Sequence, residues 1–147
     1  MVIGHRRAAA ALAAVLSLAA ATAIAQPTRV ALDHEATIAG VGVACTGIGQ
    51  TKNDPKWLAY PVRVEFAGAG GDYLANETLM LSDAKGAQLL AVSCEGPWIL
   101  LKLAPGRSYK VDGQVGRTAE VTVSATVKAP SHGQAVVVLN FPMRGDP

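Results

Sequence analysis

Closely spaced turn residues in the second half of the chain constrain its fold more than any other feature. Residues 83–86 read DAKG, residues 96–98 read GPW, and residues 104–109 read APGRSY. The first of these sequences places Asp at the first position and Gly at the fourth position of a β-turn. Turn sequences at intervals of about ten residues leave room only for short extended segments, as in a small β-sandwich. We therefore predict several short strands within residues 77–114.

Hydrophobic patterns on either side of this region predict further strands. Residues 57–66 read as one strand because apolar and polar residues alternate at its end, and residues 119–127 show the clearest alternation in the chain. Residues 98–103 are apolar on both phases, which is typical of a central strand. No segment after residue 25 is predicted to be a helix. The sequence thus predicts an all-β domain at residues 37–142, a two-sheet β-sandwich of seven to eight strands, with a small barrel as the alternative.

The first 25 residues have the features of a secretory signal peptide. A short basic start with Arg6 and Arg7 precedes an almost unbroken run of Ala, Leu and Val, and residues 23–25 read AIA. We expect cleavage after Ala25 and a periplasmic or secreted location in a bacterium, by the general secretory or the twin-arginine route. The apolar run is shorter than the roughly 20 residues of a spanning helix, so we expect no stable membrane span after cleavage. Residues 26–36 are expected to form a leader or an edge strand, and residues 143–147 a tail.

Removal of this segment balances the charge of the chain. The whole sequence has 13 Lys and Arg and 11 Asp and Glu, and 13 less Arg6 and Arg7 leaves 11 basic against 11 acidic residues. A mature chain without net charge offers no electrostatic basis for binding nucleic acid or an anionic membrane surface.

Cys45 and Cys94 are the two cysteines of the chain, and both follow the predicted cleavage site. In an exported protein, two cysteines most simply form one disulfide. Their separation of 49 positions is not a C-x-x-C motif, and two isolated thiols make a poor zinc site. We expect a structural disulfide, with free thiols or a redox or metal role as the alternatives.

The sequence after residue 25 carries no recognisable catalytic pattern. It lacks G-x-S-x-G, and its acidic residues fall at predicted turns and strand ends instead of forming a converging pair. His34 and His132 lie 98 positions apart, and a copper or zinc site would have to recruit them together with Met80 or Met143. We therefore expect a protein that is not an enzyme and that has no metal or cofactor.

Three aromatic residues are candidates for a binding surface. Trp57 and Tyr60 flank a predicted loop, and Trp98 follows Gly-Pro at the start of the most apolar segment. Exposed together, they would hold a peptide or a glycan. The alternative interpretation is that they pack in the core or at the ends of the sheets.

The ordered set of turns and strands resembles the carboxypeptidase regulatory-like domain, in the form of small exported proteobacterial proteins that carry one such domain. The resemblance covers residues 60–141 and rests on four pieces of sequence: GDYLA at 71–75, SDAKG at 82–86, EGPWIL at 95–100 and LAPGRSYKV at 103–111. It implies a transthyretin-like (prealbumin-like) sandwich with an accessory role in folding or interaction and without catalytic residues. The residues that it marks as structural are Asp83, Gly86, Gly96, Pro97, Pro105, Gly106 and Tyr109.

These observations favour a non-enzymatic periplasmic module that is structural or binds an envelope protein, a peptide or a glycan. Exposed strand edges or end loops would supply the contact. One alternative is a periplasmic inhibitor of a cell-wall hydrolase or a protease, for which a rigid protruding loop at residues 46–56 would be the candidate. Another is a metal carrier, which requires His34 and His132 to converge with a methionine.

Overall fold

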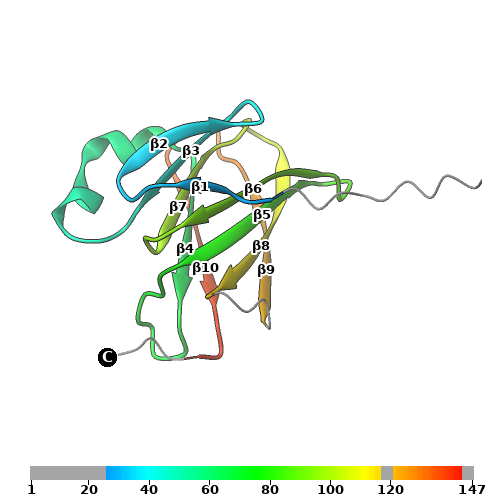
Figure 1. Cartoon of the computed structure of the whole chain (residues 1–147). Helices are drawn as coiled ribbons and strands as arrows, with labels where there is room; N and C mark the ends of the chain where they lie inside the picture. Colours follow the sequence, from blue (N-terminus) through cyan, green and yellow to red (C-terminus); the bar gives the residue numbers. More distant parts are fainter. Residues whose placement is uncertain (1–25, 117–120, 144–147) are drawn as a thin grey trace, which may run out of the picture.

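Two five-stranded sheets packed face to face form the protein, which we describe from a computed structural model at residues 26–116 and 121–143 (Figure 1). Sheet A has the strand order β1-β6-β5-β8-β9, and sheet B has the order β10-β4-β7-β3-β2. Each sheet is mixed, because β1 runs parallel to β6 and β10 runs parallel to β4. The predicted all-β sandwich is thereby confirmed. The strands are β1 (Thr28–Val30), β2 (His34–Ile38), β3 (Val41–Thr46), β4 (Val62–Ala67), β5 (Glu77–Asp83), β6 (Gln88–Cys94), β7 (Trp98–Lys102), β8 (Ser108–Val115), β9 (Thr122–Lys128) and β10 (Ala135–Asn140).

The described residues contain ten strands, whereas the sequence predicts seven to eight. The additional strands arise at residues 28–38, where β1 joins sheet A and β2 joins sheet B. A two-residue turn at Ala39 and Gly40 connects β2 to β3, so these two strands form a hairpin. The segment expected as a leader or edge strand therefore supplies an edge strand to each sheet.

Residues 57–61 are not part of a strand, contrary to the prediction for residues 57–66. Two short 3-10 helices, η1 (Gln50–Asn53) and η2 (Pro55–Ala59), precede β4. Pro55 stands at the start of η2, and Oδ1 of Asp54 accepts a hydrogen bond from the backbone N–H of Lys56 at 2.9 Å. A proline at the first position and a capping Asp stabilise a helix start, and these local signals override the β pattern that follows.

The core lies between the two sheets, and buried and more exposed side chains alternate along strands such as β5. On β5, Leu79 and Leu81 are fully buried, and they lie opposite Val92 and Leu90 of β6 within the same sheet. Gly113 of β8 lets the aromatic ring of Phe66 approach across the sandwich. The inward phase of both sheets is thus a continuous apolar layer.

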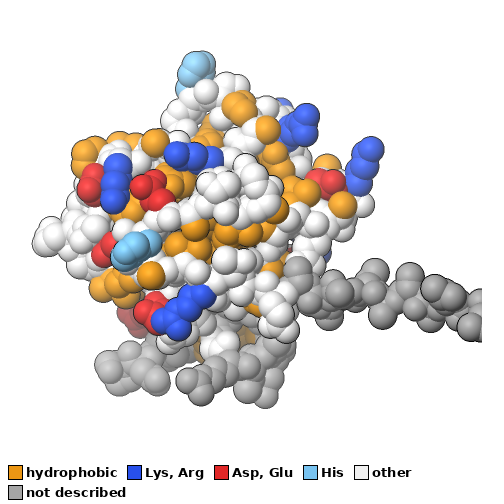
Figure 2. All heavy atoms as spheres, turned by 45° about the horizontal axis from the view of Figure 1, so that its top comes forward, with side chains coloured by type: hydrophobic (Ala, Val, Ile, Leu, Met, Phe, Trp, Pro, Cys, Tyr) orange, Lys and Arg blue, Asp and Glu red, His pale blue; other side chains and the backbone are white. Residues whose placement is uncertain are grey.

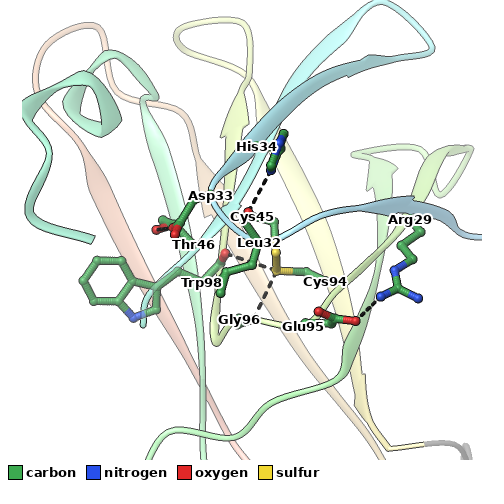
Figure 3. Close-up of a disulfide and its surroundings, with 10 residues drawn as sticks. All are labelled: Arg29, Leu32, Asp33, His34, Cys45, Thr46, Cys94, Glu95, Gly96 and Trp98. Atoms are coloured by element: carbon green, nitrogen blue, oxygen red, sulfur yellow. Dashed lines mark hydrogen bonds and ion pairs between the residues drawn. A yellow bond between two sulfur atoms is a disulfide. The ribbon is translucent and has the colours of Figure 1, made fainter. Parts of the chain in front are cut away.

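A disulfide between Cys45 of β3 and Cys94 of β6 links the two sheets, as predicted (Figure 3). Both cysteines are buried, and their Cα atoms are 5.6 Å apart. The bridge therefore fixes sheet B to sheet A near the ends of β3 and β6.

Gly96 lies beside this bridge, where the chain has no room for a side chain. A Cβ at this position would overlap the backbone carbonyl oxygen of Thr46 and lie 2.6 Å from Cδ1 of Leu32. We expect Gly96→Ala to lower the free energy of unfolding by about 2 kcal/mol, because backbone must shift to relieve the overlap. Urea unfolding measures this change. Gly70→Ala is the matched control, since its Cβ would meet only Asp72 at 3.4 Å, and equal stability of the two variants would contradict the packing argument.

Parts of three predicted segments lie outside the described residues. These are residues 1–25 with the predicted signal peptide, residues 119–120 of a predicted strand and residues 144–147 of the predicted tail. In the part of the chain that the structure describes, no helix combines the length and the apolar character needed to cross a bilayer.

Candidate functional site

The turn residues marked by the sequence have structural roles. Oδ1 of Asp83 accepts hydrogen bonds from the backbone N–H groups of Lys85 and Ala87, both at 2.9 Å. Gly86 has a φ of 86°, which L-residues with a side chain rarely adopt, and its N–H donates to the carbonyl of Asp83 at 3.0 Å. This turn joins β5 to β6, and the carboxylate of Asp83 is used to hold it.

The turn before β8 is held in a similar way. The backbone N–H of Gly106, which follows Pro105, donates to the carbonyl of Ala129 at 2.8 Å. The ring of Tyr109 is buried, and its hydroxyl oxygen accepts from the backbone N–H of Ala104 at 3.3 Å. Pro97 packs close to Gly47, in the same tight region as Gly96.

Trp57, Tyr60 and Trp98 do not form an exposed aromatic surface, because each of them is at most 8% exposed. Trp57 and Tyr60 pack with Ala44 and Leu100 as a small second cluster outside the main core. Ala44 of β3 and Leu100 of β7 face away from the main core. These apolar side chains on the outer face of sheet B would be exposed to water unless another segment packed over them. The segment with η2 supplies this cover, and the aromatic rings are buried as a result.

Hydrogen bonds hold this covering segment rigidly on sheet B. Nε1 of Trp57 donates to the carbonyl of Thr51 at 2.8 Å. Nε2 of Gln134 donates to the carbonyl oxygens of Trp57 and Tyr60 at 3.0 and 2.9 Å. The hydroxyl of Tyr60 donates to Oε1 of Glu35 at 2.5 Å. Burial raises the pKa of Tyr60, and the hydrogen bond with Glu35 raises this pKa further, so Tyr60 remains a neutral donor.

Trp98 is covered by two polar residues on the same outer face. The guanidinium of Arg63 lies 4.2 Å from the centroid of the Trp98 ring. The Tyr73 ring meets the Trp98 ring edge-on, with 6.0 Å between the two ring centroids. Glu65 connects the two covering residues, because its carboxylate lies 2.9 Å from Nε of Arg63 and accepts from the Tyr73 hydroxyl at 3.3 Å. The charges of Arg63 and Glu65 therefore compensate each other.

Exposed apolar side chains of β10 lie directly beside this group. In the parallel register of β10 and β4, Val136 is opposite Arg63, and Val138 is opposite Glu65. Val136, Val138 and Tyr73 are each 45–46% exposed. We call this surface the β10 face, which consists of Arg63, Glu65, Tyr73, Trp98, Val136 and Val138. The sequence analysis did not identify it, although an uncharged run at residues 135–140 was a usable signal.

Among the described residues, no strand pairs with one side of the β10 backbone. The N–H groups of Ala135 and Phe141 donate to carbonyls of Pro61 and Ala67, both at 2.8 Å. Because alternate residues of a strand point their backbone groups to opposite sides, residues 136, 138 and 140 direct their N–H and C=O groups away from β4. β9 lies near β10 in the other sheet, but among the described residues no backbone hydrogen bond joins the two strands.

The other three edge strands carry features that discourage pairing. β1 has only three residues, β2 contains His34 and Glu35, and β9 ends in Lys128. Short edges and charged residues prevent the addition of another strand, whereas a longer uncharged edge permits it. β10 has six residues with no charge, no Gly and no Pro, so within residues 26–116 and 121–143 it is the edge strand that lacks these features.

His34 and His132 are too far apart in the fold to share a ligand. His34 belongs to β2 and His132 to the loop before β10, and these strands are the opposite edges of sheet B with three strands between them. At about 4.8 Å per strand, the separation is roughly 19 Å. Within residues 26–116 and 121–143, no group of three or more His, Cys, Asp or Glu side chains could hold a metal ion. The geometry thus contradicts the condition on which the metal-carrier alternative depends.

Glu77, the first residue of β5, is a buried carboxyl group. Its place at the end of a strand agrees with the prediction that the acidic residues fall at turns and strand ends. Its side chain is 1% exposed, on the same phase of β5 as Leu79 and Leu81. Neither carboxylate oxygen has a hydrogen-bond partner among the described residues. Burial raises the pKa of Glu77 to about 9. A raised pKa often marks a catalytic group. Glu77 is almost wholly buried, and it lines a pocket of about 390 Å³ together with Arg29 and Glu95.

The fold and its open edge define a small disulfide-linked β-sandwich with one strand available for pairing. Comparison with known proteins adds no family assignment, because no protein-family model and no curated protein matches the chain. Figure 2 shows basic and acidic side chains interspersed on the face turned forward, without a continuous area of one charge. The functional argument therefore depends on the geometry of the β10 face and its edge.

Proposed function

We propose that this protein is a non-enzymatic binding module of the bacterial cell envelope that takes its partner by strand addition at β10. The observation that carries the proposal is the unpaired edge of β10 with Val136 and Val138 exposed beside it. In strand addition, main-chain hydrogen bonds supply affinity and the alternate side chains supply specificity. Both requirements are met at one edge of sheet B.

Three observations support the envelope location and the accessory role. The first 25 residues have the composition of a signal peptide. The disulfide is consistent with an oxidising compartment. The turn residues whose structural roles are described above are those of the carboxypeptidase regulatory-like resemblance, which implies an interaction module without catalytic residues.

The chemistry of the described residues supports a binding role over catalysis. The charged and hydroxyl groups of the β10 face are engaged with one another, as the Arg63–Glu65 pair and the Tyr73 hydrogen bond show. The carboxyl group with a raised pKa, Glu77, is 1% exposed at the base of a pocket. A general acid or base must reach a proton of the substrate, and the charged groups of the β10 face are already paired with each other.

A specific observation also favours inhibition of an envelope hydrolase or protease as a second function. The segment between β3 and β4, which includes residues 47–56 of the predicted loop, projects at the left of Figure 1 and is held by the hydrogen bonds of Trp57 and Gln134. Within and beside it, Ile48 and Leu58 are 48% and 67% exposed. A rigid loop that presents an apolar side chain loses little entropy on binding.

The substitution Val138→Lys tests the strand-addition proposal. The outward Lys places a charge on the edge of β10 while the hydrogen bonds to β4 remain. We therefore expect the variant to capture at least about tenfold less of the partner than the wild-type protein captures from envelope extract. Thr126→Lys on the outward phase of β9 is the matched control and should retain the partner. Quantitative mass spectrometry of the captured material is the measurement.

The same experiment separates the two functions. Leu58→Asp should leave capture unchanged if β10 is the binding edge, because Leu58 lies in η2 and not in β10. Loss of the partner with Leu58→Asp and its retention with Val138→Lys would contradict strand addition and favour the inhibitor function.

A further inference from the structure

We infer that a pocket between the β5–β6 turn and the turn before β8 binds a small organic carboxylate that carries an apolar side chain. The pocket has a volume of about 420 Å³, and sites for small ligands commonly measure about 300–1,000 Å³. Its lining comes from sheet A, whereas β10 is an edge of sheet B. The inference therefore adds a second binding site to the protein and does not depend on strand addition.

The two turns meet because β5 and β8 are neighbouring antiparallel strands. Asp83 at the end of β5 lies opposite Tyr109 near the start of β8. Residues 83–86 and 104–107 therefore come together at one end of sheet A, although 21 positions separate them in the sequence. This arrangement brings Lys85 of one turn and Arg107 of the other to the same pocket.

The lining of the pocket carries more positive than negative charge. Lys85 and Arg107 are exposed, and among the described residues no carboxylate forms an ion pair with either of them. Asp83 also lines the pocket, but its Oδ1 accepts two hydrogen bonds from the backbone of its own turn. Lys128, which is opposite Ser108 in the register of β8 and β9, adds a positive charge at this end of the sheet. These charges favour an anionic ligand.

The backbone of both turns is held in place by hydrogen bonds. In the first turn, the N–H of Gly86 donates to the carbonyl of Asp83 at 3.0 Å. In the second turn, the N–H of Gly106 donates to the carbonyl of Ala129 at 2.8 Å, and the N–H of Ala129 donates to the carbonyl of Arg107 at 2.9 Å. A site whose backbone is ordered before binding loses less entropy when the ligand arrives.

The rest of the lining provides an apolar wall and a hydroxyl group. Leu89 is 36% exposed, and Ala84 lines the pocket beside it. The hydroxyl of Ser108 is a donor for an anion, and the guanidinium of Arg107 matches the two oxygens of a carboxylate. An inorganic anion would leave the apolar wall in water, and an uncharged apolar molecule would leave the two cations without a counter-charge. A carboxylate with an apolar side chain satisfies both parts of the pocket.

Titration of the ¹⁵N-labelled protein with N-acetyl-leucine tests the inference. N-acetyl-leucine amide has the same side chain without the charge, and inorganic phosphate has a negative charge without the side chain. We expect N-acetyl-leucine to shift the amide signals of Lys85 and Ser108. It should bind at least about tenfold more tightly than either of the other two compounds.

Substitutions test whether the two cations of the pocket hold the carboxylate. Lys85→Gln and Arg107→Gln should each weaken the binding of N-acetyl-leucine by about tenfold. Both side chains are exposed, so these variants should retain the fold. Lys52→Gln removes the same charge from η1, outside the pocket, and should leave the affinity unchanged.

The outcomes separate this inference from the proposed function. Equal affinity for N-acetyl-leucine and its amide, or for N-acetyl-leucine and phosphate, would overturn the inferred ligand chemistry. Absence of shifts at Lys85 and Ser108 would overturn the site itself. Val138→Lys should bind N-acetyl-leucine as the wild type does, because β10 belongs to the other sheet, so failure of strand addition and failure of this pocket are observed independently.

Discussion

The double substitution Cys45→Ala and Cys94→Ala is expected to lower the free energy of unfolding by about 4 kcal/mol. The two cysteines are 49 positions apart, and closing a loop of that length removes conformational entropy of this order from the unfolded chain. The bridge also joins β3 of sheet B to β6 of sheet A, so the unbridged sheets are held only by side-chain packing. Urea unfolding followed by tryptophan fluorescence measures the change, because Trp57 and Trp98 are both buried.

A reducing agent provides the control for this prediction. Reduction should shift the unfolding midpoint of the wild-type protein toward that of the double variant and leave the double variant unchanged. The melting temperature should fall by more than about 10 °C. A double variant as stable as the oxidised wild type would show that packing alone holds the sheets together.

Glu77→Leu is expected to raise the free energy of unfolding by about 3 kcal/mol at pH 7 and to remove most of its dependence on pH. Glu77 is almost wholly buried. Its register neighbours, Cys94 of β6 and Val115 of β8, provide no charge to stabilise an ionised carboxylate, and its carboxylate oxygens have no hydrogen-bond partner among the described residues. Leucine fills a similar volume without a polar atom to desolvate. The gain follows from removal of a group that must remain protonated in the folded state.

The direction of the pH dependence follows from the two pKa values of Glu77. Burial raises its pKa from the ordinary value of 4.5 to about 9 in the folded protein. Between these values the folded state holds a proton that the unfolded state releases, so the free energy of unfolding falls as pH rises from about 5 to about 9. The stabilisation that the protonated Glu77 allows is fully present below pH 4.5, and it is lost above pH 9.

Unfolding at pH 5, 7 and 9 checks this account of Glu77. The wild-type protein should lose up to about 1.4 kcal/mol per pH unit relative to Glu77→Leu across this range. Glu95→Leu is the control, because Glu95 is half exposed beside Arg29 and its removal should leave the slope unchanged (Figure 3). Parallel pH profiles for the wild type and Glu77→Leu would mean that Glu77 is ionised or hydrated in the folded state.

The fold class could be predicted because turns and strands leave patterns in neighbouring residues. The disulfide could be predicted because the two cysteines allow a single pairing. Asp83 and Gly86 specify a turn through hydrogen bonds within five residues. The number of strands was not predicted correctly, because β1 is stabilised by parallel pairing with β6, more than sixty positions away. Such pairing leaves no local pattern in a three-residue strand.

The candidate site was harder to predict because it depends on the order of strands in the sheets. Whether Val136 and Val138 are buried or exposed follows from the position of β10 at the edge of sheet B, and alternation in the sequence cannot show this position. The burial of Trp57 follows from the docking of η2 on an outer face that carries Leu100. Aromatic composition alone therefore indicated the wrong surface.

Hydrogen exchange of the β10 backbone amides, measured by NMR with and without the captured partner, tests strand addition most directly. In the free protein, we expect slow exchange at Val137 and Leu139, which pair with β4, and fast exchange at Val136, Val138 and Asn140. Binding of the partner should slow exchange at these three amides by about a hundredfold or more. Amides of Val136, Val138 and Asn140 that still exchange rapidly in the complex would contradict strand addition at β10.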